Sequence, residues 1–172
     1  MAKKTGLSLT KAGKAKPGGA SDAAPLMLDL ERSVPVLATI LANRVTTTGS
    51  LMFRKRHGLG SMEWKVLATL ATGTGITGAQ ISQLIGLDAG GVSRVLKAFV
   101  ARGIIQVEQS ARHSNYQSIT LTAMGRRLHD EAILTAFERE QVLLKTFSVE
   151  ERDKLIDFLQ RLIAQSRNLT TT

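Results

Sequence analysis

Residues 77–103 read TGAQISQLIGLDAGGVSRVLKAFVARG and carry the clearest structural pattern in the chain. The run contains two short amphipathic helical patterns that meet at Gly86, with Thr77 and Asp88 as predicted N-caps. The second pattern carries small, polar and basic side chains near its start. Two helices joined in this way are typical of a helix-turn-helix, whose second helix enters the DNA major groove. The stretch therefore indicates a DNA duplex as the partner.

The length and composition place the chain among globular proteins. Its 172 residues, 43% hydrophobic and 22% charged, suit one domain with tails. No apolar run approaches the roughly 18 residues that span a bilayer, and no apolar segment of the secretory type follows the N-terminal lysines. The absence of cysteine excludes a disulfide framework and thiolate metal sites. We expect a cytoplasmic, nucleoid-associated protein without a membrane partner.

The net charge of +9 is unevenly distributed. Residues 50–127 hold ten Lys and Arg against three acidic residues, a net charge of +7, whereas residues 128–172 hold six basic and eight acidic residues, a net charge of −2. The positive excess of the patterned region thus falls on the helix-turn-helix segment. A polyanionic partner predicts this coincidence, because neutralising phosphates releases counterions. Charge and motif together favour nucleic-acid binding over a generally basic protein.

The patterns divide the chain into four parts. Residues 1–24 form a basic tail that we expect to be disordered, either following a DNA groove or simply solvated. Residues 25–58 form an N-terminal helix from about Leu26, with Pro35 near its beginning. Residues 59–121 form the DNA-binding lobe, and residues 122–168 form the C-terminal helices.

Two β-prone runs follow the helix-turn-helix, at 104–109 and 116–121, and predict a hairpin of the kind called a wing. Thr122 is then expected to cap a long helix, and Ser148 with Glu151 forms a capping box for the last one. These helices place apolar side chains at helical spacing that a small lobe cannot cover; they include Leu128, Phe137, Leu144, Phe147, Leu155, Leu159 and Leu162. We expect a mainly α fold with a small β-wing, in which the N- and C-terminal helices form a dimerisation region. Intrachain packing of the two ends is the alternative.

The motifs GLGSMEWKVL (58–67), GLD (86–88), VSRV (92–95), ARGII (101–105) and LTAMG (121–125) complete the pattern. In this order, and over about residues 30–165, the chain resembles the MarR family of dimeric winged-helix transcription regulators. The resemblance implies a homodimer, DNA-facing Ser93 and Arg94, and a pocket for phenolic or aromatic acids that weaken DNA binding. The wing departs from the family pattern, because no Asp-Arg pair precedes Leu121-Thr122.

Most candidate DNA contacts lie at the start of the fourth predicted helix. Asp88 caps it, and Gly90, Gly91 and Ser93 are expected to be exposed early, where small residues allow close approach to the groove. Arg94 and Lys97 lie on the following turn. A guanidinium can read guanine O6 and N7 with both nitrogens, although Arg94 could instead contact phosphate or pair with a carboxylate.

Further candidate contacts flank this helix. Thr77 and Gln80 begin the third helix, whose N-terminal amides can bind phosphate. In the wing, Arg112 and Asn115 are candidates; Arg112 suits a narrow minor groove or remains a solvated loop charge.

A ligand pocket is expected beside the junction of the first helix and the lobe. Met52, Arg54, His57 and Trp64 flank this junction and would offer an apolar cleft with cationic groups, which suits an aromatic carboxylate. The alternative is that Trp64 belongs to the core and the arginines touch DNA or solvent.

Other functions find little support in the sequence. Residues 73–78 match G-x-G-x-x-G, but they follow a helical pattern and lack a downstream acidic partner, so an oxidoreductase is disfavoured. The histidines show no metal-ligand spacing, and no nucleophile–base pair is present; we expect no metal, no cofactor and no enzymatic activity. The leading interpretation is a repressor on a palindromic operator, with recognition helices roughly 34–36 Å apart. A non-specific architectural DNA-binding protein is the alternative.

Overall fold

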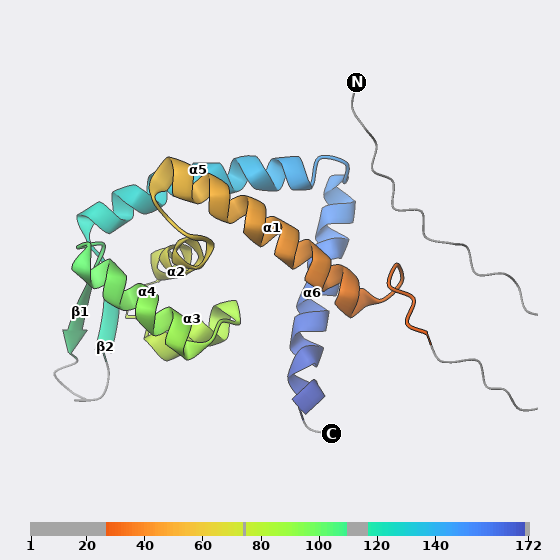
Figure 1. The fold of residues 1–172 in the computed structure, drawn as a ribbon, viewed down its shortest axis with the longest axis horizontal. Coiled ribbons are helices and arrows are strands. Elements are labelled where there is room, and N and C mark those ends of the chain that lie inside the picture. The colour runs from red at the N-terminus through yellow and green to blue at the C-terminus, as the bar shows by residue number, and fades with distance from the viewer. Residues whose placement is uncertain (1–26, 74, 110–116, 171–172) are drawn as a thin grey trace, which may run out of the picture.

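The computed structural model describes residues 27–73, 75–109 and 117–170 (Figure 1). Its elements are α1 (Val34–His57), α2 (Ser61–Ala71), α3 (Gly78–Ile85), α4 (Ala89–Ala101), β1 (Ile105–Gln109), β2 (Gln117–Leu121), α5 (Ala123–Leu143), α6 (Val149–Ser166) and the 3-10 helix η1 (Arg167–Thr170). The predicted class, mainly α with a small β-wing, is confirmed.

The core lies in the lobe formed by α2, α3, α4 and the two strands. Leu67 of α2, Ile81 of α3 and Phe99 of α4 are fully inaccessible to solvent, and Ile104 and Ile119 close the core from the wing. These residues recur at the helical and strand periods seen in the sequence, so each element buries one face. The lobe is therefore held together by a continuous apolar interior.

The helix-turn-helix begins and ends at the caps that the sequence predicts. The Thr77 Oγ1 accepts the Gln80 N–H at 3.2 Å, and the Gln80 Oε1 accepts the Thr77 N–H at 2.9 Å. Gly86 ends α3 in the left-handed region, with φ 63°, which a residue with a Cβ adopts only with strain. Asp88 then accepts the Gly91 N–H at 2.6 Å and begins α4. Local hydrogen bonding thus fixes the turn between the two helices.

The wing is an antiparallel pair in which Ile105 faces Leu121 and Val107 faces Ile119. Its loop residues 110–116 lie outside the described residues. The Ile119 N–H also donates to the Ile76 carbonyl at 3.3 Å, which ties the second strand to the segment before α3. The wing and the helix-turn-helix therefore form one unit.

The first helix begins later along the chain than predicted. It begins at Val34 rather than near Leu26, with Pro35 in its first turn, and the Ser33 side chain makes no capping hydrogen bond. It also runs unbroken through residues 46–49. The Thr48 hydroxyl donates to the Arg44 carbonyl at 2.9 Å, and the Arg139 side chain packs over the buried Gly49, so this segment is supported from α5.

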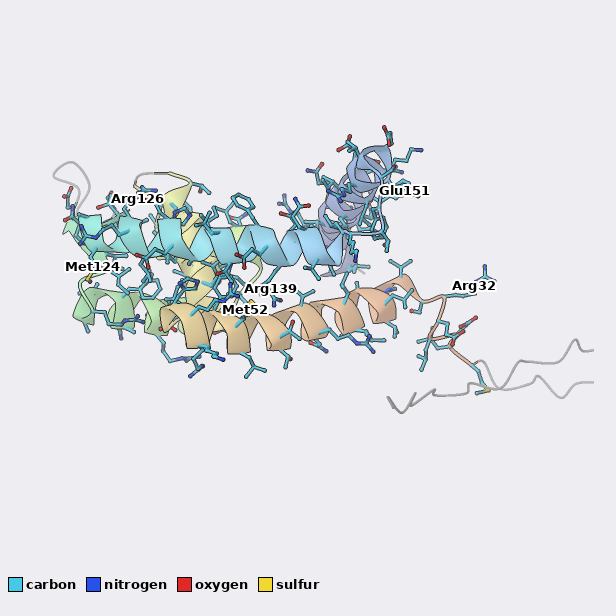
Figure 2. The ribbon with its side chains drawn as sticks, turned by 90° about the horizontal axis from the view of Figure 1, so that it is seen from above. Arg32, Met52, Met124, Arg126, Arg139 and Glu151 are labelled. Atoms are coloured by element: carbon cyan, nitrogen blue, oxygen red, sulfur yellow. The ribbon has the colours of Figure 1, made fainter. Side chains whose placement is uncertain are left out.

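The long helix α5 joins the wing to the helical ends. The Thr122 Oγ1 accepts the Gly125 N–H at 3.1 Å and donates to the Gly103 carbonyl at 2.7 Å. Gly125 is buried against the wing, because a Cβ there would lie 2.1 Å from the Ile104 carbonyl oxygen. Figure 2 shows α5 running beside α1, with Met52 and Arg139 between the two helices. The start of α5 thus belongs to the lobe, whereas its end leaves it.

The last helix stands apart from the lobe (Figure 1). Its predicted capping box is present: Glu151 and Ser148 exchange backbone–side-chain hydrogen bonds of 2.8 and 3.2 Å. Backbone hydrogen bonding and the Ser148 hydroxyl lower the pKa of the Glu150 carboxyl. No residue of α6 is buried. No helix within the described ranges has the length and apolarity needed to cross a membrane.

Candidate nucleic-acid interface

The exposed face of α4 carries three of the predicted DNA contacts. Val92, Val95 and Phe99 are buried and hold the helix on the core. With about 100° between successive residues, the opposite face is centred on Gly90, Ser93 and Lys97, and all three are exposed. A face of small and cationic residues on a capped, firmly packed helix can enter a major groove.

Gly91 departs from its prediction. It is buried, not exposed, because α4 rests on α2 at this point. A Cβ there would lie 2.7 Å from Asp88 Oδ2 and 3.1 Å from the Met62 sulfur and its methyl carbon. The glycine thus permits close helix packing and N-capping by Asp88, while Gly90 alone of the pair faces outward.

Arg94 lies at the edge of the exposed face. Its guanidinium folds back along α4, so that a Cβ on Gly90 would lie 3.6 Å from its Nη1. Together with Val95 and Ala98 it also lines a cleft between α4, α2 and α1. Arg94 is therefore positioned both beside the groove-facing residues and beside that cleft.

Thr77 and Gln80 lie at the start of α3, as predicted, but their polar groups already bond to each other. Gly78 packs against Leu96 of α4, where a Cβ would come within 3.2 Å of the leucine methyl carbon. This contact places the start of α3 along one flank of α4. Arg112 and Asn115, the predicted wing contacts, lie outside the described residues.

The structure divides the four predicted ligand residues. Met52 and Trp64 line a cavity of about 720 Å³ between α1, α2 and α5. Arg54 instead lines a second cleft beside α4, of about 510 Å³, which adjoins the cavity at Thr46, Ser61 and Lys65. His57 lies against α5, with its Nε2 2.9 Å from the Thr135 Oγ1. The four residues therefore do not form a single site.

Trp64 lies between two other rings, with centroid distances of 4.8 Å to Phe53 and 6.1 Å to His129. Its ring therefore packs as part of the core while it also contributes to the cavity wall.

Two arginines that line the cavity between α1, α2 and α5 were not predicted from the sequence. Arg44 lines it from α1 and Arg139 from α5. The Arg139 Nη2 donates to the Val45 carbonyl at 2.9 Å and to the Thr48 Oγ1 at 3.1 Å. No local motif marks Arg139, since its partners lie about 90 residues away along the chain.

Within the described residues, no group of three or more His, Cys, Asp or Glu side chains could hold a metal ion. Of the glycine-rich segment, residues 75–77 lead into α3 and Ile76 bridges to the wing, so these residues do not form a strand-to-helix turn of the dinucleotide-binding kind.

Residues 57–114, which include the helix-turn-helix and the first wing strand, match the family model of the MarR family. The fold also matches solved structures of that family over most of the chain. A MarR/EmrR family transcriptional regulator from Acinetobacter sp. ADP1 is 28% identical with a TM-score of 0.78, covering 83% of this chain and all of that one. The lobe of this chain thus carries the winged helix-turn-helix of the MarR family, and its fold is that of MarR-family regulators.

Two further structures share the MarR fold at lower identity. The MepR–DNA complex from S. aureus is 18% identical with a TM-score of 0.69, covering 78% of this chain and 97% of that one. PcaV from Streptomyces coelicolor, in complex with its natural ligand, is 19% identical with a TM-score of 0.69, and the match covers 82% of this chain and 99% of that one. No curated protein matches this chain. The family and fold are those of transcriptional regulators.

Proposed function

We propose that this MarR-family chain is a homodimeric repressor that reads a palindromic operator with α4 and releases it on binding a small aromatic acid or phenol. The exposed face of α4 carries the proposal. Its Gly90, Ser93 and Lys97 face outward, while Val92 and Phe99 fix the helix on the core. We further propose that it acts at the nucleoid, in the cytoplasm.

The homodimer is proposed from the helical ends. The first half of α1, the end of α5 and the whole of α6 expose large apolar side chains, among them Leu37, Leu41, Phe137, Val142, Leu143, Phe158, Leu162 and Ile163. Burying one such side chain contributes roughly 1.5–3 kcal/mol, so their exposure in a single chain is costly. A two-fold partner would cover them and place a second α4 on the neighbouring major groove. Residues 25–58 and 122–168 would then form the dimerisation region, and 59–121 the DNA-binding lobe.

The effector is proposed for the cavity between α1, α2 and α5. Its apolar wall includes Met52, Phe53 and Trp64. Its charged lining comprises the cations Arg44, Lys65 and Arg139 and the carboxylates Glu138 and Glu140, of which Glu138 pairs with Arg56. An apolar cavity with a few cationic groups suits an aromatic carboxylate. Because α1 and α5 lead to the helical ends and α2 belongs to the lobe, a ligand there would change the spacing of the two lobes.

The DNA-binding proposal is tested with Arg94→Ala and matched duplexes. We expect the variant to lose more affinity for a selected operator than for a random duplex, because a bidentate base contact supplies roughly 1–3 kcal/mol of discrimination. Fluorescence anisotropy at fixed salt measures both affinities. Equal losses on the two duplexes would reduce Arg94 to a phosphate contact, and no loss on either would remove α4 from the interface.

The effector is tested separately by thermal-shift screening of aromatic acids. A compound that binds the native protein raises its Tm, and a true effector also releases the operator. Neither stabilisation nor release by any aromatic acid or phenol would contradict this part of the proposal.

A further inference from the structure

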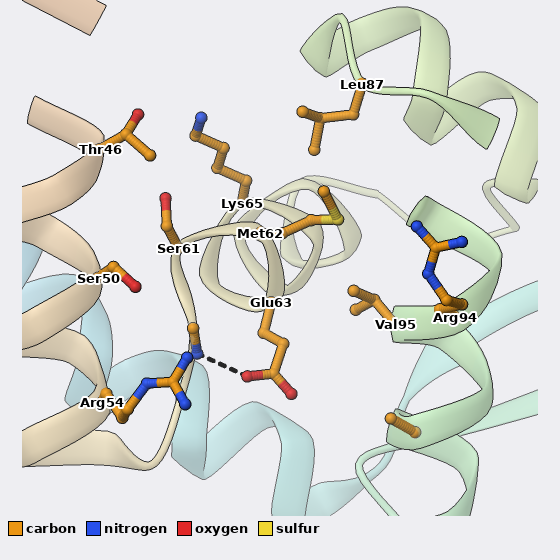
Figure 3. A pocket seen from close by; sticks show the side chains of 12 residues that line it. Thr46, Ser50, Arg54, Ser61, Met62, Glu63, Lys65, Leu87, Arg94 and Val95 are labelled. Atoms are coloured by element: carbon orange, nitrogen blue, oxygen red, sulfur yellow. Dashed lines mark hydrogen bonds between the residues drawn. The ribbon is translucent and has the colours of Figure 1, made fainter. Parts of the chain in front are cut away.

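A second cleft lies beside α4 (Figure 3) and shares Thr46, Ser61 and Lys65 with the effector cavity. It has a volume of about 510 Å³ and lies between the middle of α1, the start of α2 and the Arg94 flank of α4. Thr46, Ser50 and Ser61 bring hydroxyl groups to it, and its cationic side chains are Arg54, Lys65 and Arg94. Three helices thus contribute one cation each.

These cations lack carboxylate partners. Among the described residues, no ion pair or hydrogen bond joins Arg54, Lys65 or Arg94 to an acidic side chain, whereas Arg56, Arg102 and Arg161 each pair with one. The only carboxylate in the cleft lining, Glu63, already accepts the Gly60 N–H at 2.5 Å and lies 3.2 Å from the Arg102 Nη1. Three like charges facing one cleft create a positive potential that an anion would relieve.

The cleft also has a defined position relative to the groove-facing residues. Leu96 lies on one flank of α4, where it meets Gly78 at the start of α3. Arg94 and Ala98 lie on the other flank, where they line the cleft. A helix of about 10–12 Å diameter fills a major groove about 12 Å wide, so a phosphate backbone runs along each of its flanks. The start of α3 would meet one backbone and the cleft the other.

We propose that Arg54 and Lys65 bind phosphates of the DNA strand that runs along the Arg94 flank of α4. This inference rests on the proposed insertion of α4 into the major groove. The two cations act as positioning residues: they fix how deeply and at what angle α4 enters the groove, and they carry no base information. The cleft shares Arg94 with the recognition face, and this continuity favours DNA over a separate small anion.

The test compares Arg54→Gln, Lys65→Gln and the double variant with Lys55→Gln as the matched control. Lys55 is the exposed neighbour of Arg54 on α1 and does not line the cleft. Binding to a random-sequence 30-base-pair duplex is followed by fluorescence anisotropy across a salt series. Each cleft variant should flatten the slope of log K against log[salt] by about 0.9, and the double variant by about twice that, while Lys55→Gln should not.

Two further measurements separate failure of this inference from failure of the proposed function. Thermal melting of each variant establishes that the fold is retained, and Arg94→Ala in the same series tests insertion of α4. If Arg94→Ala weakens binding while the cleft variants match Lys55→Gln, the phosphate contacts are overturned and the proposed function stands. Benzoate that stabilises the wild type but not Arg54→Gln, with unchanged DNA slopes, would make the cleft a small-anion site and likewise overturn the inference.

Discussion

The lobe buries its large apolar side chains, whereas the helical ends, which are the first half of α1, the end of α5 and the whole of α6, leave many of theirs exposed. In the lobe, Leu59, Leu67, Ile81 and Phe99 are fully inaccessible to solvent. In the ends, no residue of α6 is buried, and side chains as large as Phe158 are more than half exposed. Both regions contain helices that carry large apolar side chains. The difference is that the lobe pairs each apolar face with another face of the same chain, whereas the ends do not.

This contrast shows which part of the molecule has a complete apolar core within a single chain and which part does not. The lobe has a complete core, so its geometry, including the α4 surface, is set within one chain. The ends present apolar faces without a cover, which in a regulator that pairs half-sites is the expected place for a second copy. Substitutions in the two regions test this contrast.

The largest stability effect is expected from Phe99→Ala in the lobe. Truncating a fully buried phenylalanine costs about 3–5 kcal/mol of unfolding free energy, and this loss should not depend on protein concentration. Phe158→Ala in α6 is the matched change at the ends, and its effect on Tm should depend on concentration because it acts through the dimer. Thermal melting over a hundredfold range of concentration distinguishes the two. A concentration-independent loss in Phe158→Ala would mean that α6 packs within its own chain.

The next effect concerns the ends alone. Replacing Leu159 and Leu162 together by Glu should convert the protein to monomers, because charges would enter the apolar α6 face. Operator affinity should fall at least about 100-fold, since the two half-sites are then no longer bound together. Gln160→Glu, on the same helix, is the control. Sedimentation velocity and operator titration measure both quantities, and a wild-type monomer in solution would contradict the account.

A smaller effect is expected at Gly125, where the lobe meets α5. Gly125→Ala places a Cβ 2.1 Å from the Ile104 carbonyl oxygen, so backbone must move, at a cost of about 1–3 kcal/mol or more. Gly90→Ala is the matched change in the first turn of α4, where a Cβ would meet only side-chain atoms, 3.2 Å from Asp88 Oδ1 and 3.6 Å from Arg94 Nη1. Denaturant titration should show a clear loss only for Gly125→Ala; equal stabilities would mean that α5 is not tightly held on the wing.

The local features of the fold were predictable from the sequence. The caps at Thr77, Asp88, Thr122 and Ser148 lie where short-range hydrogen-bonding patterns place them, because a cap depends on residues three positions apart. The position of the wing follows from period-two alternation in the same way. Gly91 was misassigned because its burial depends on Met62, a residue of another helix.

Long-range arrangements were not predictable. Arg139 reaches α1 through space that Gly49 leaves open, and neither residue signals the other along the chain. The four predicted ligand residues lie close in sequence, but Arg54 and Met52 point to different sides of α1 because two residues differ by about 200° on a helix. The sequence alone therefore merged the cavity that we propose for the effector and the cationic cleft into one site.

The most direct test is selection of genomic DNA fragments by the purified full-length protein, followed by sequencing. We expect enrichment of one motif with two inverted half-sites whose centres lie about one helical turn apart, matching two α4 helices roughly 34–36 Å apart. A flat profile with no enriched motif, together with steep salt dependence, would instead indicate an architectural DNA-binding protein and contradict the account.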